Sequence, residues 1–135
     1  PSIIPQNYLE DVHERLVLYK RIASCNTNND LKELQIEMID RFGLLPDSTK
    51  HLFANTRLKL FCEKIGIDEI SLYDDKAIIT FGPKNTIEPI KIIQLIQKQP
   101  KNYQLKGQNQ LIVKESMPED IRRIELVENL LKKLN

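Results

Sequence analysis

The sequence predicts an α+β fold: three N-terminal helices, then two β-hairpins forming a small antiparallel sheet, with two further helices. Two observations lead to this prediction. In residues 8–65, apolar side chains recur every three or four positions, which is typical of amphipathic helices. In residues 69–81 and 103–114, the apolar residues instead form short runs around turn-forming residues, which is typical of hairpins. The two further helices are expected between the hairpins and at the end of the chain.

A single domain is expected because 135 residues is close to the usual size of one domain. We expect this domain to span residues 8–135. Residues 1–7 are expected to be the remnant of a linker, because they include two prolines and the chain does not begin with Met. With 41% hydrophobic residues, the domain can bury a core without disulfides.

The two cysteines predict a reducing compartment. Cys25 and Cys62 have no CxxC spacing, and a chain of this length does not need a disulfide, so free thiols are expected. The sequence has no apolar run of membrane length and no signal-peptide pattern. These observations favour a cytoplasmic protein without a membrane partner.

The first helix is expected over residues 8–24, with an apolar stripe wide enough to make it broadly buried. The stripe consists of Leu9, Val12, Leu16, Val17, Leu18, Tyr19, Ile22 and Ala23. A polar turn follows at residues 25–29. The second helix is expected to begin near residue 29 or 30, because Asp30 followed by Glu33 resembles a capping box.

Glycines and prolines mark the ends of the second and third helices. Gly43 suits the residue that follows the last turn of the second helix, in the left-handed conformation, and Pro46 prevents any continuation. The third helix is expected from residue 47 or 48 to residue 64, and Gly66 closes it. The first half of the chain is therefore three helices joined by short turns.

The second half changes to the pattern of strands. The first hairpin is expected to pair residues 69–73 with residues 76–81 about Asp74 and Asp75. The second is expected to pair residues 103–105 with residues 110–114 about the turn at 107–109. Antiparallel hairpins beside helices predict a sheet that is covered on one face.

Two more helices accompany the hairpins. The fourth is expected over residues 86–99, because Pro89 suits a first turn and Pro100 follows the end. The last is expected to begin at Ser116 and Glu119, whose spacing resembles a capping box, and to continue to the C-terminus.

The sequence contains no recognisable catalytic or metal-binding motif. Neither GxxxxGK[ST] nor GxGxxG occurs, so no phosphate-binding loop is predicted. His13 and His51 have no Cys, Asp or second His at ligand spacing. Nothing in the sequence places a base beside Cys25 or Cys62, as a nucleophile would require. We therefore expect no enzymatic activity, no cofactor and no metal.

Carboxylates gather on one side of the second helix. Glu33, Glu37 and Asp40 share a face, and Ile36 falls beside Asp40 away from the main apolar stripe. A solvated helix face explains these acids without any partner, and Glu37 can pair with Arg41 one turn later. A contact face for a basic partner explains them too. Ile36 is either a core residue or an apolar anchor in that contact.

The second half of the chain is basic. Residues 76–135 carry 11 Lys and Arg against 6 Asp and Glu, whereas residues 1–75 carry 9 against 13. This asymmetry suggests two different partner surfaces, although solvated faces on a neutral domain would look the same. A module that contacts DNA or RNA polymerase through the Lys-rich second half is the alternative function. Direct DNA contact is disfavoured because Tyr103 is the only aromatic residue near these lysines.

Three stretches of the sequence resemble one family. They are Tyr19-Lys20-Arg21-Ile22-Ala23, the run from Glu37 to Pro46 that contains Asp40-Arg41-Phe42-Gly43, and Leu95-Ile96-Gln97-Lys98-Gln99-Pro100. Together with Arg122-Arg123-Ile124-Glu125, they resemble the C-terminal domain of bacterial transcription-repair coupling factors (Mfd). The resemblance spans nearly the whole chain. The hairpin at residues 74–75 is shorter than the family pattern.

The resemblance implies a regulatory role without catalysis. The parent would be an ATP-driven DNA translocase that displaces stalled RNA polymerase and recruits nucleotide-excision repair. Its C-terminal domain acts as a clamp that packs on the repair-homology module and hides the surface that binds the repair protein UvrA. The family motif maps the contact carboxylates onto Glu37 and Asp40. Glu33 and Ile36 are expected to complete this partner-binding site.

Overall fold

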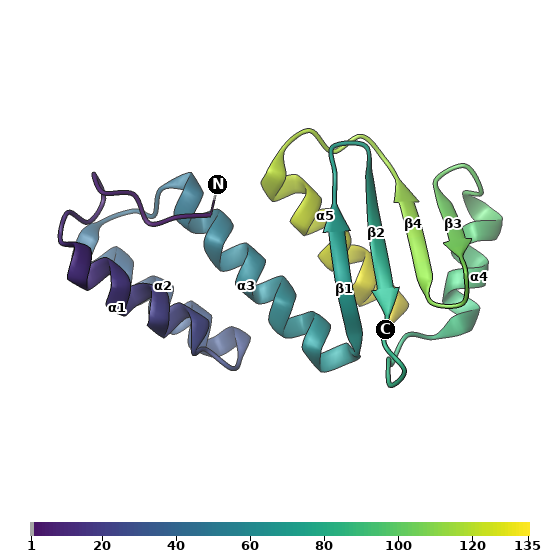
Figure 1. Cartoon of the computed structure of the whole chain (residues 1–135), viewed down its shortest axis with the longest axis horizontal. Coiled ribbons are helices and arrows are strands. Elements are labelled where there is room, and N and C mark those ends of the chain that lie inside the picture. The colour runs from purple at the N-terminus through teal and green to yellow at the C-terminus, as the bar shows by residue number, and fades with distance from the viewer. Residues whose placement is uncertain (1) are drawn as a thin grey trace. The chain divides into compact units, whose positions relative to one another are not determined.

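A computed structural model describes residues 2–135 of the chain. The chain divides into two compact units, Pro1–Leu60 and Phe61–Asn135. Figure 1 labels the five helices and four strands along the chain. The described residues therefore form the predicted α+β fold, with the predicted order of elements.

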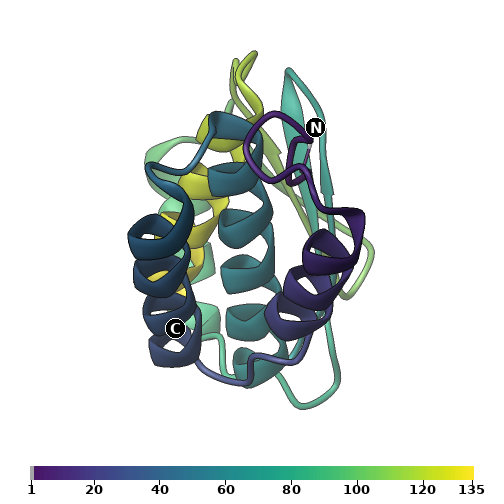
Figure 2. The same ribbon diagram turned by 90° about the vertical axis from the view of Figure 1, so that its left-hand side faces the viewer.

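The first unit contains α1 (Val12–Ala23), α2 (Asn28–Phe42) and most of α3 (Asp47–Ile65). Figure 2 shows α1 and α2 in front, with α3 behind them. Large apolar side chains from the three helices and the preceding segment form one core: Ile4, Leu9, Leu18, Ile22, Leu31, Leu34, Met38, Leu45 and Phe53. Each helix contributes a single stripe to this core, as the sequence pattern predicts.

Part of the segment expected to be a linker remnant packs into this first unit. Ile4 is buried, and its N–H donates to the Tyr19 hydroxyl at 2.7 Å. The Ile3 N–H donates to the Ser48 carbonyl, and the Thr49 hydroxyl donates to the Ile3 carbonyl at 2.9 Å. Hydrogen bonds therefore hold residues 3 and 4 against the helices, and Ile4 is also held by burial.

Helix α1 is less buried than its sequence predicts, and it begins later. The Asp11 carboxylate accepts hydrogen bonds from the N–H groups of His13 and Glu14, so the helix starts at Val12 rather than at residue 8. Only Leu18 and Ile22 are buried within it. The other apolar positions of the predicted stripe remain exposed at Val12 (60%), Leu16 (54%) and Val17 (43%). The prediction of a broadly buried helix was wrong, because α1 meets the core along one narrow stripe.

Helix α2 begins with a capping box, but not the predicted one. Thr27 is the N-cap, and its hydroxyl accepts from the Asp30 N–H at 3.0 Å. The Asp30 carboxylate accepts in return from the Thr27 N–H at 3.2 Å. Asp30 is therefore the third residue of the box rather than the cap, and Glu33 lies outside it. Gly43 ends the helix with a positive φ of 93°, as predicted, but its ψ of −173° is not left-handed helical.

The second unit is built around a four-stranded antiparallel sheet. Its strands are β1 (Ile67–Leu72), β2 (Lys76–Phe81), β3 (Tyr103–Lys106) and β4 (Gln110–Lys114). They lie in the order β1-β2-β4-β3, so each predicted hairpin forms and β2 joins β4 at the centre. The sequence located these hairpins correctly.

Helices α4 (Pro89–Lys98) and α5 (Asp120–Leu134) accompany the sheet. Figure 1 shows α5 passing behind β1 and β2, and α4 beside β3. Most of the least exposed side chains of this unit come from the sheet and α5: Ala77, Ile79, Leu111, Val113, Ile124, Val127 and Leu131. The core of this unit is thus the layer between the sheet and α5.

The predicted capping box at the start of α5 does not form. Glu119 is the N-cap residue and makes no side-chain hydrogen bond to the helix. The preceding segment is instead tied to the first hairpin, because the N–H groups of Glu115 and Met117 donate to the carbonyls of Asp75 and Asp74. Met117 is fully buried. These contacts hold Ser116 away from the capping position.

Replacing Thr27 by Ala tests the revised cap. Loss of the hydroxyl leaves the Asp30 N–H without its partner, so Thr27→Ala should lower the free energy of unfolding by about 1 kcal/mol. Urea unfolding of the 135-residue chain measures this change. The control is Glu33→Gln, which should be nearly neutral. A larger loss for Glu33→Gln than for Thr27→Ala would restore the original capping prediction.

Gly66 and Gly43 form a matched pair, since both have positive φ (80° and 93°). A Cβ at Gly66 would lie 2.6 Å from the Asn85 Cα, whereas one at Gly43 would meet nothing within 4 Å. Gly43→Ala should therefore cost about 1–3 kcal/mol from backbone strain alone, because its φ and ψ lie in a region that is essentially restricted to glycine. Gly66→Ala adds a backbone clash and should cost about 2–5 kcal/mol. Equal losses in thermal or urea unfolding would show that this contact is not close.

Candidate functional site

The predicted partner-binding residues divide into two groups in the structure. Glu33, Ile36 and Asp40 are spaced three and four residues apart on α2, so they lie along one face of the helix. All three are exposed, and Ile36 keeps 60% of its surface open to solvent. We call Glu33, Ile36 and Asp40 the outer face of α2. Glu37 is half-buried at the border of this face.

Ile36 is an exposed apolar residue, which settles one alternative left open by the sequence. The buried stripe of α2 consists of Leu31, Leu34 and Met38, and Ile36 projects away from it. Ile36 is therefore not a core residue. An exposed aliphatic side chain between two carboxylates is the arrangement that an apolar anchor in a polar contact requires.

Glu37 is held by two arginines in an alternating ion-pair network. Arg21 on α1 binds both oxygens of the Glu37 carboxylate, at 2.5 and 2.8 Å. Arg41, one turn along α2, lies 3.3 Å from the same carboxylate and 3.0 Å from Glu14 on α1. The network of Arg21, Glu37, Arg41 and Glu14 thus crosses twice between the two helices. The predicted pairing of Glu37 with Arg41 is confirmed, and Arg21 is the stronger partner.

The network lowers the pKa of Glu37. Hydrogen bonds from Arg21 are the main cause, and its charge and the contact with Arg41 act in the same direction, so the pKa falls from 4.5 to about 2. Glu37 is therefore a carboxylate at all physiological pH values, but its charge is already compensated. Asp40 and Glu33 differ from Glu37, because neither side chain makes an ion pair within residues 2–135.

Residues of the Asp40-Arg41-Phe42-Gly43 motif fix the end of α2. The Arg41 guanidinium lies 4.7 Å from the centre of the Phe42 ring, and Phe42 packs edge-on against Tyr8. The Tyr8 hydroxyl donates to the Gly43 carbonyl at 2.8 Å and to the Met38 carbonyl at 3.3 Å. The Tyr8 hydroxyl therefore ties the segment before α1 to the end of α2. The motif therefore positions the last turn, which carries Asp40.

The histidines and cysteines form no group that could hold a metal ion in the part of the chain that the structure describes. His51 Nδ1 makes hydrogen bonds with the side chains of Ser2 and Asn55, and no carboxylate joins them. Burial raises the pKa of the Cys62 thiol to about 11 and raises that of Cys25 as well. Both thiols are therefore weaker nucleophiles than an unperturbed cysteine at neutral pH.

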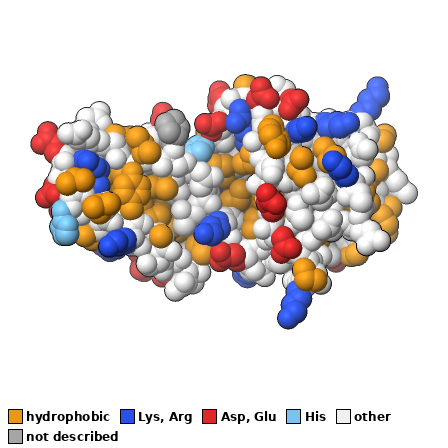
Figure 3. Space-filling model, in the orientation of Figure 1, with side chains coloured by type: hydrophobic (Ala, Val, Ile, Leu, Met, Phe, Trp, Pro, Cys, Tyr) orange, Lys and Arg blue, Asp and Glu red, His pale blue; other side chains and the backbone are white. Residues whose placement is uncertain are grey.

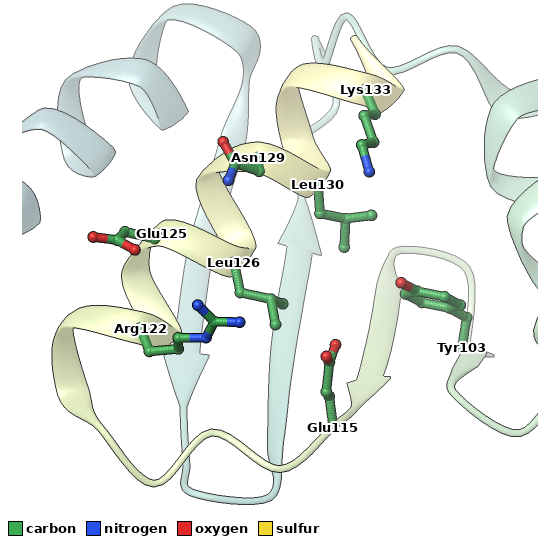
Figure 4. A pocket seen from close by; sticks show the side chains of 8 residues that line it. All are labelled: Tyr103, Glu115, Arg122, Glu125, Leu126, Asn129, Leu130 and Lys133. Atoms are coloured by element: carbon green, nitrogen blue, oxygen red, sulfur yellow. The ribbon is translucent and has the colours of Figure 1, made fainter.

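Two hollows in the surface contain charged side chains. One, of about 330 Å³, lies beside the network and is lined by Arg21, Ser24, Cys25, Asp30, Glu33, Leu34 and Glu37. The other, of about 270 Å³, lies between α5 and the end of the sheet. Figure 4 shows Arg122 and Lys133 on the side of α5 that faces Tyr103 and Glu115, whereas Glu125 points away from them. Charges of both signs line each hollow.

No helix among residues 2–135 combines the length and the apolar character that crossing a membrane requires.

The structure is a small α+β fold in which two carboxylates and an isoleucine lie exposed on the outer face of α2. The chain belongs to the TRCF domain family, which matches residues 1–92. It is 40% identical over 134 residues to the transcription-repair-coupling factor of Escherichia coli (strain K12). It is also 40% identical over 132 residues to that of Haemophilus influenzae. The matches cover 99% and 98% of this chain but only 12% of each relative.

A solved structure shares the fold. The crystal structure described as the C-terminal domain of transcription-repair coupling factor superposes with a TM-score of 0.75. Sequence identity is 22%, and the match covers 98% of this chain and 88% of that chain. The family resemblance seen in the sequence is therefore confirmed, and the chain corresponds to a C-terminal domain of a transcription-repair coupling factor.

Sequence reasoning did not find the role of Arg21. Arg21 belongs to one of the stretches that carry the family resemblance, but its partner is sixteen residues away on another helix. Pairing across two helices depends on how their stripes pack, and spacing alone does not determine this. One signal was available in the sequence. Each helix carries a glutamate before an arginine, Glu14 and Arg21 on α1 and Glu37 and Arg41 on α2, so opposite charges meet when the two helices run in opposite directions.

Titration of Glu37 tests the network. Because the folded pKa lies below the ordinary value, the network stabilises the fold fully above about pH 4.5, and this contribution is lost as pH falls towards about 2. The Glu37 carboxyl carbon shift in NMR should therefore titrate with a midpoint near pH 2. In Arg21→Gln the midpoint should rise towards 4.5. A midpoint near 4.5 in the unaltered chain would contradict the geometry.

Proposed function

We propose that this chain is the non-catalytic autoinhibitory clamp of a transcription-repair coupling DNA translocase. In this proposal the outer face of α2 contacts the repair-homology module of the parent protein and masks the surface that binds UvrA. Such a role belongs to the cytoplasm of a bacterium, with RNA polymerase and UvrA as indirect partners. The family relationship supports the parent protein, and the exposed Ile36 between Glu33 and Asp40 carries the assignment of the contact.

The uncompensated charge of Asp40 supports its role in the contact. A partner arginine or lysine meets a free carboxylate at Asp40, whereas at Glu37 it would compete with Arg21 and Arg41. Complementary charges determine which surfaces meet and in what orientation more than they determine raw affinity. We therefore assign Asp40 and Ile36 to the centre of the contact and Glu33 to its edge.

Glu37 has a different part in this proposal. Its two arginines tie α2 to α1 and thereby fix the direction in which the outer face points. Glu37 positions the contact from its border and adds negative potential there. This division of roles accounts for the difference between Glu37, whose charge is paired, and Asp40, whose charge is not.

A weak contact is sufficient for a clamp that is tethered to its target. A short linker gives an effective concentration on the order of mM, and longer linkers give less. A ligand shifts such an equilibrium only by its preference for one of the two states, so a weak latch opens more readily than a tight one. Burial of one isoleucine and pairing of one or two carboxylates suit a contact of this strength.

The clamp is tested by titrating the 135-residue chain against the isolated repair-homology module. Asp40→Lys should weaken binding about tenfold, because repulsion replaces attraction at the centre of the contact. Ile36→Ser should weaken binding through loss of apolar burial, without a change in salt dependence. The matched control is Glu63→Lys, a charge reversal on the exposed surface of α3, which should change affinity less than twofold.

The same substitutions in the full-length parent protein test the masking. Asp40→Lys combined with Ile36→Ser should increase UvrA binding, and Glu63→Lys should not. Absence of binding between the unaltered chain and the module would refute the clamp. Binding that is unchanged by Asp40→Lys and Ile36→Ser would show that the contact lies on another surface of the chain.

A further inference from the structure

The hollow of about 270 Å³ between α5 and the end of the sheet has an apolar wall and a polar border. The wall consists of Leu126, which is half-buried, and Leu130, which is buried. Tyr103, at the start of β3, lies opposite this side of α5. Drug-sized ligands usually occupy pockets of about 300–1,000 Å³, so the hollow suits a smaller molecule.

Three charged side chains converge on this hollow. Figure 4 shows Arg122 and Lys133 turned from α5 toward Glu115, which directly follows β4. Glu125 also lines the hollow, but it points away from the other charged groups. The charges that face the enclosed space are therefore two cations and one carboxylate.

These three charges are unpaired. None of Arg122, Lys133 and Glu115 makes an ion pair within residues 2–135. The next arginine along α5 differs, because Arg123 lies 2.8 Å from the Asp120 carboxylate. Arg122 and Glu115 line one hollow and still lie beyond ion-pair distance of each other. The space between them can therefore take the charged groups of a ligand.

Tyr103 adds a hydrogen-bonding group at the same place. Figure 4 shows its hydroxyl directed toward the space between Glu115 and Lys133. Burial is the main cause that raises the pKa of Tyr103, and the Glu115 carboxylate raises it further, which agrees with the two side chains lying close together. The phenol therefore keeps its proton at neutral pH and can donate to an anion.

Arg122 and Lys133 lie at the two ends of the hollow. Their positions differ by eleven residues, which is close to three helical turns, so both project from one side of α5. The same spacing separates their Cα atoms by about 16 Å along the helix axis. A ligand that binds both side chains therefore needs an acidic group at each end. Leu126 and Leu130 lie between the two cations and can pack against the methylene groups of such a ligand.

Phosphate and nucleic acid fit this hollow less well. Glu115 repels a phosphate group, which offers it no positively charged donor. Tyr103 is the one aromatic residue among those that line the hollow, whereas strand-binding surfaces usually offer several. Both acidic and basic side chains occur on the face of the second unit that Figure 3 shows, so this face does not have the single sign that a long polyanion favours.

We propose that this hollow binds an acidic amino acid such as glutamate, which carries two carboxylates and one ammonium group. Arg122 and Lys133 each bind one carboxylate. Glu115 accepts hydrogen bonds from the ammonium group, and the Tyr103 hydroxyl donates to a carboxylate. The single net negative charge of this ligand complements the single net positive charge of the three side chains. The site is independent of the proposed clamp, because no residue of α2 lines it.

Titration of the 135-residue chain with sodium glutamate, followed by amide NMR spectra, tests the proposal. Sodium chloride at equal ionic strength is the blank. The amide signals of Tyr103, Glu115 and Leu126 should shift and reach saturation, with a dissociation constant on the order of millimolar, because the site is open to solvent. Two analogues each lack one charged group. Glutarate lacks the ammonium group and glutamine lacks one carboxylate, so each should bind at least about threefold more weakly.

Substitutions in the hollow assign the contacts. Arg122→Gln should weaken glutamate binding at least about fivefold. Glu115→Gln should weaken glutamate binding and strengthen glutarate binding, so the preference between the two ligands is lost. General damage to the fold would not produce opposite changes for two ligands. The matched control is Glu125→Gln, which should change affinity less than about twofold, because Glu125 points away from the hollow. All three side chains are exposed, so the variants should keep the melting temperature of the unaltered chain.

Four outcomes would overturn the proposal. The first is a set of shifts that does not saturate or that sodium chloride reproduces. The second is equal affinity for glutamate and glutarate, which would indicate a general anion site. The third is glutamate binding that Arg122→Gln leaves unchanged. The fourth is tighter binding of inorganic phosphate than of glutamate, which would assign the two cations to phosphate instead.

Discussion

The one-sided burial of α2 determines most of what this chain presents to a partner. Leu31, Leu34 and Met38 enter the core of the first unit, and helical geometry then fixes the direction of every other side chain on α2. Residues on the opposite side of α2 therefore face solvent or a partner. The ion pairs to α1 add little stability by themselves, because they are exposed. They instead fix the orientation of α2 relative to α1, which apolar contacts between two helices determine only loosely.

Carboxylates that look equivalent in the sequence differ once the helices are packed. The charge of Glu37 is compensated by two arginines, whereas Asp40, less than one turn away, faces solvent without a counterion. Charges that are paired within the protein fix how its helices pack, and unpaired charges determine which partner surfaces are attracted. A helix face that combines both is stable alone and still selective towards a basic surface. This distinction applies equally to the second unit, where Arg123 and Asp120 pair while Arg122 and Lys133 do not.

The sequence predicted the elements well because their signals are local. Helical periodicity and the turn at Asp74 and Asp75 act over a few residues, and each has its expected effect on the backbone. Gly43 ends α2 with the expected positive φ. Errors arose where distant contacts decide. The capping box at Ser116 did not form, because the residues beside it make hydrogen bonds with the first hairpin. Val12 stayed exposed because the core of the first unit meets another side of α1. The partner of Glu37 and the hollow beside α5 depend on packing that spacing cannot reveal.

The strand order has a consequence for how the second unit folds. Each hairpin closes over a few residues, but the two central strands pair residues 76–80 with residues 110–114. Joining them requires the intervening chain, including α4, to close a long loop first, which costs entropy before any central contact forms. Neither hairpin alone can bury its apolar face against a second layer of structure. The sheet and its helices should therefore assemble in one late cooperative step, with the hollow beside α5 completed at the same moment.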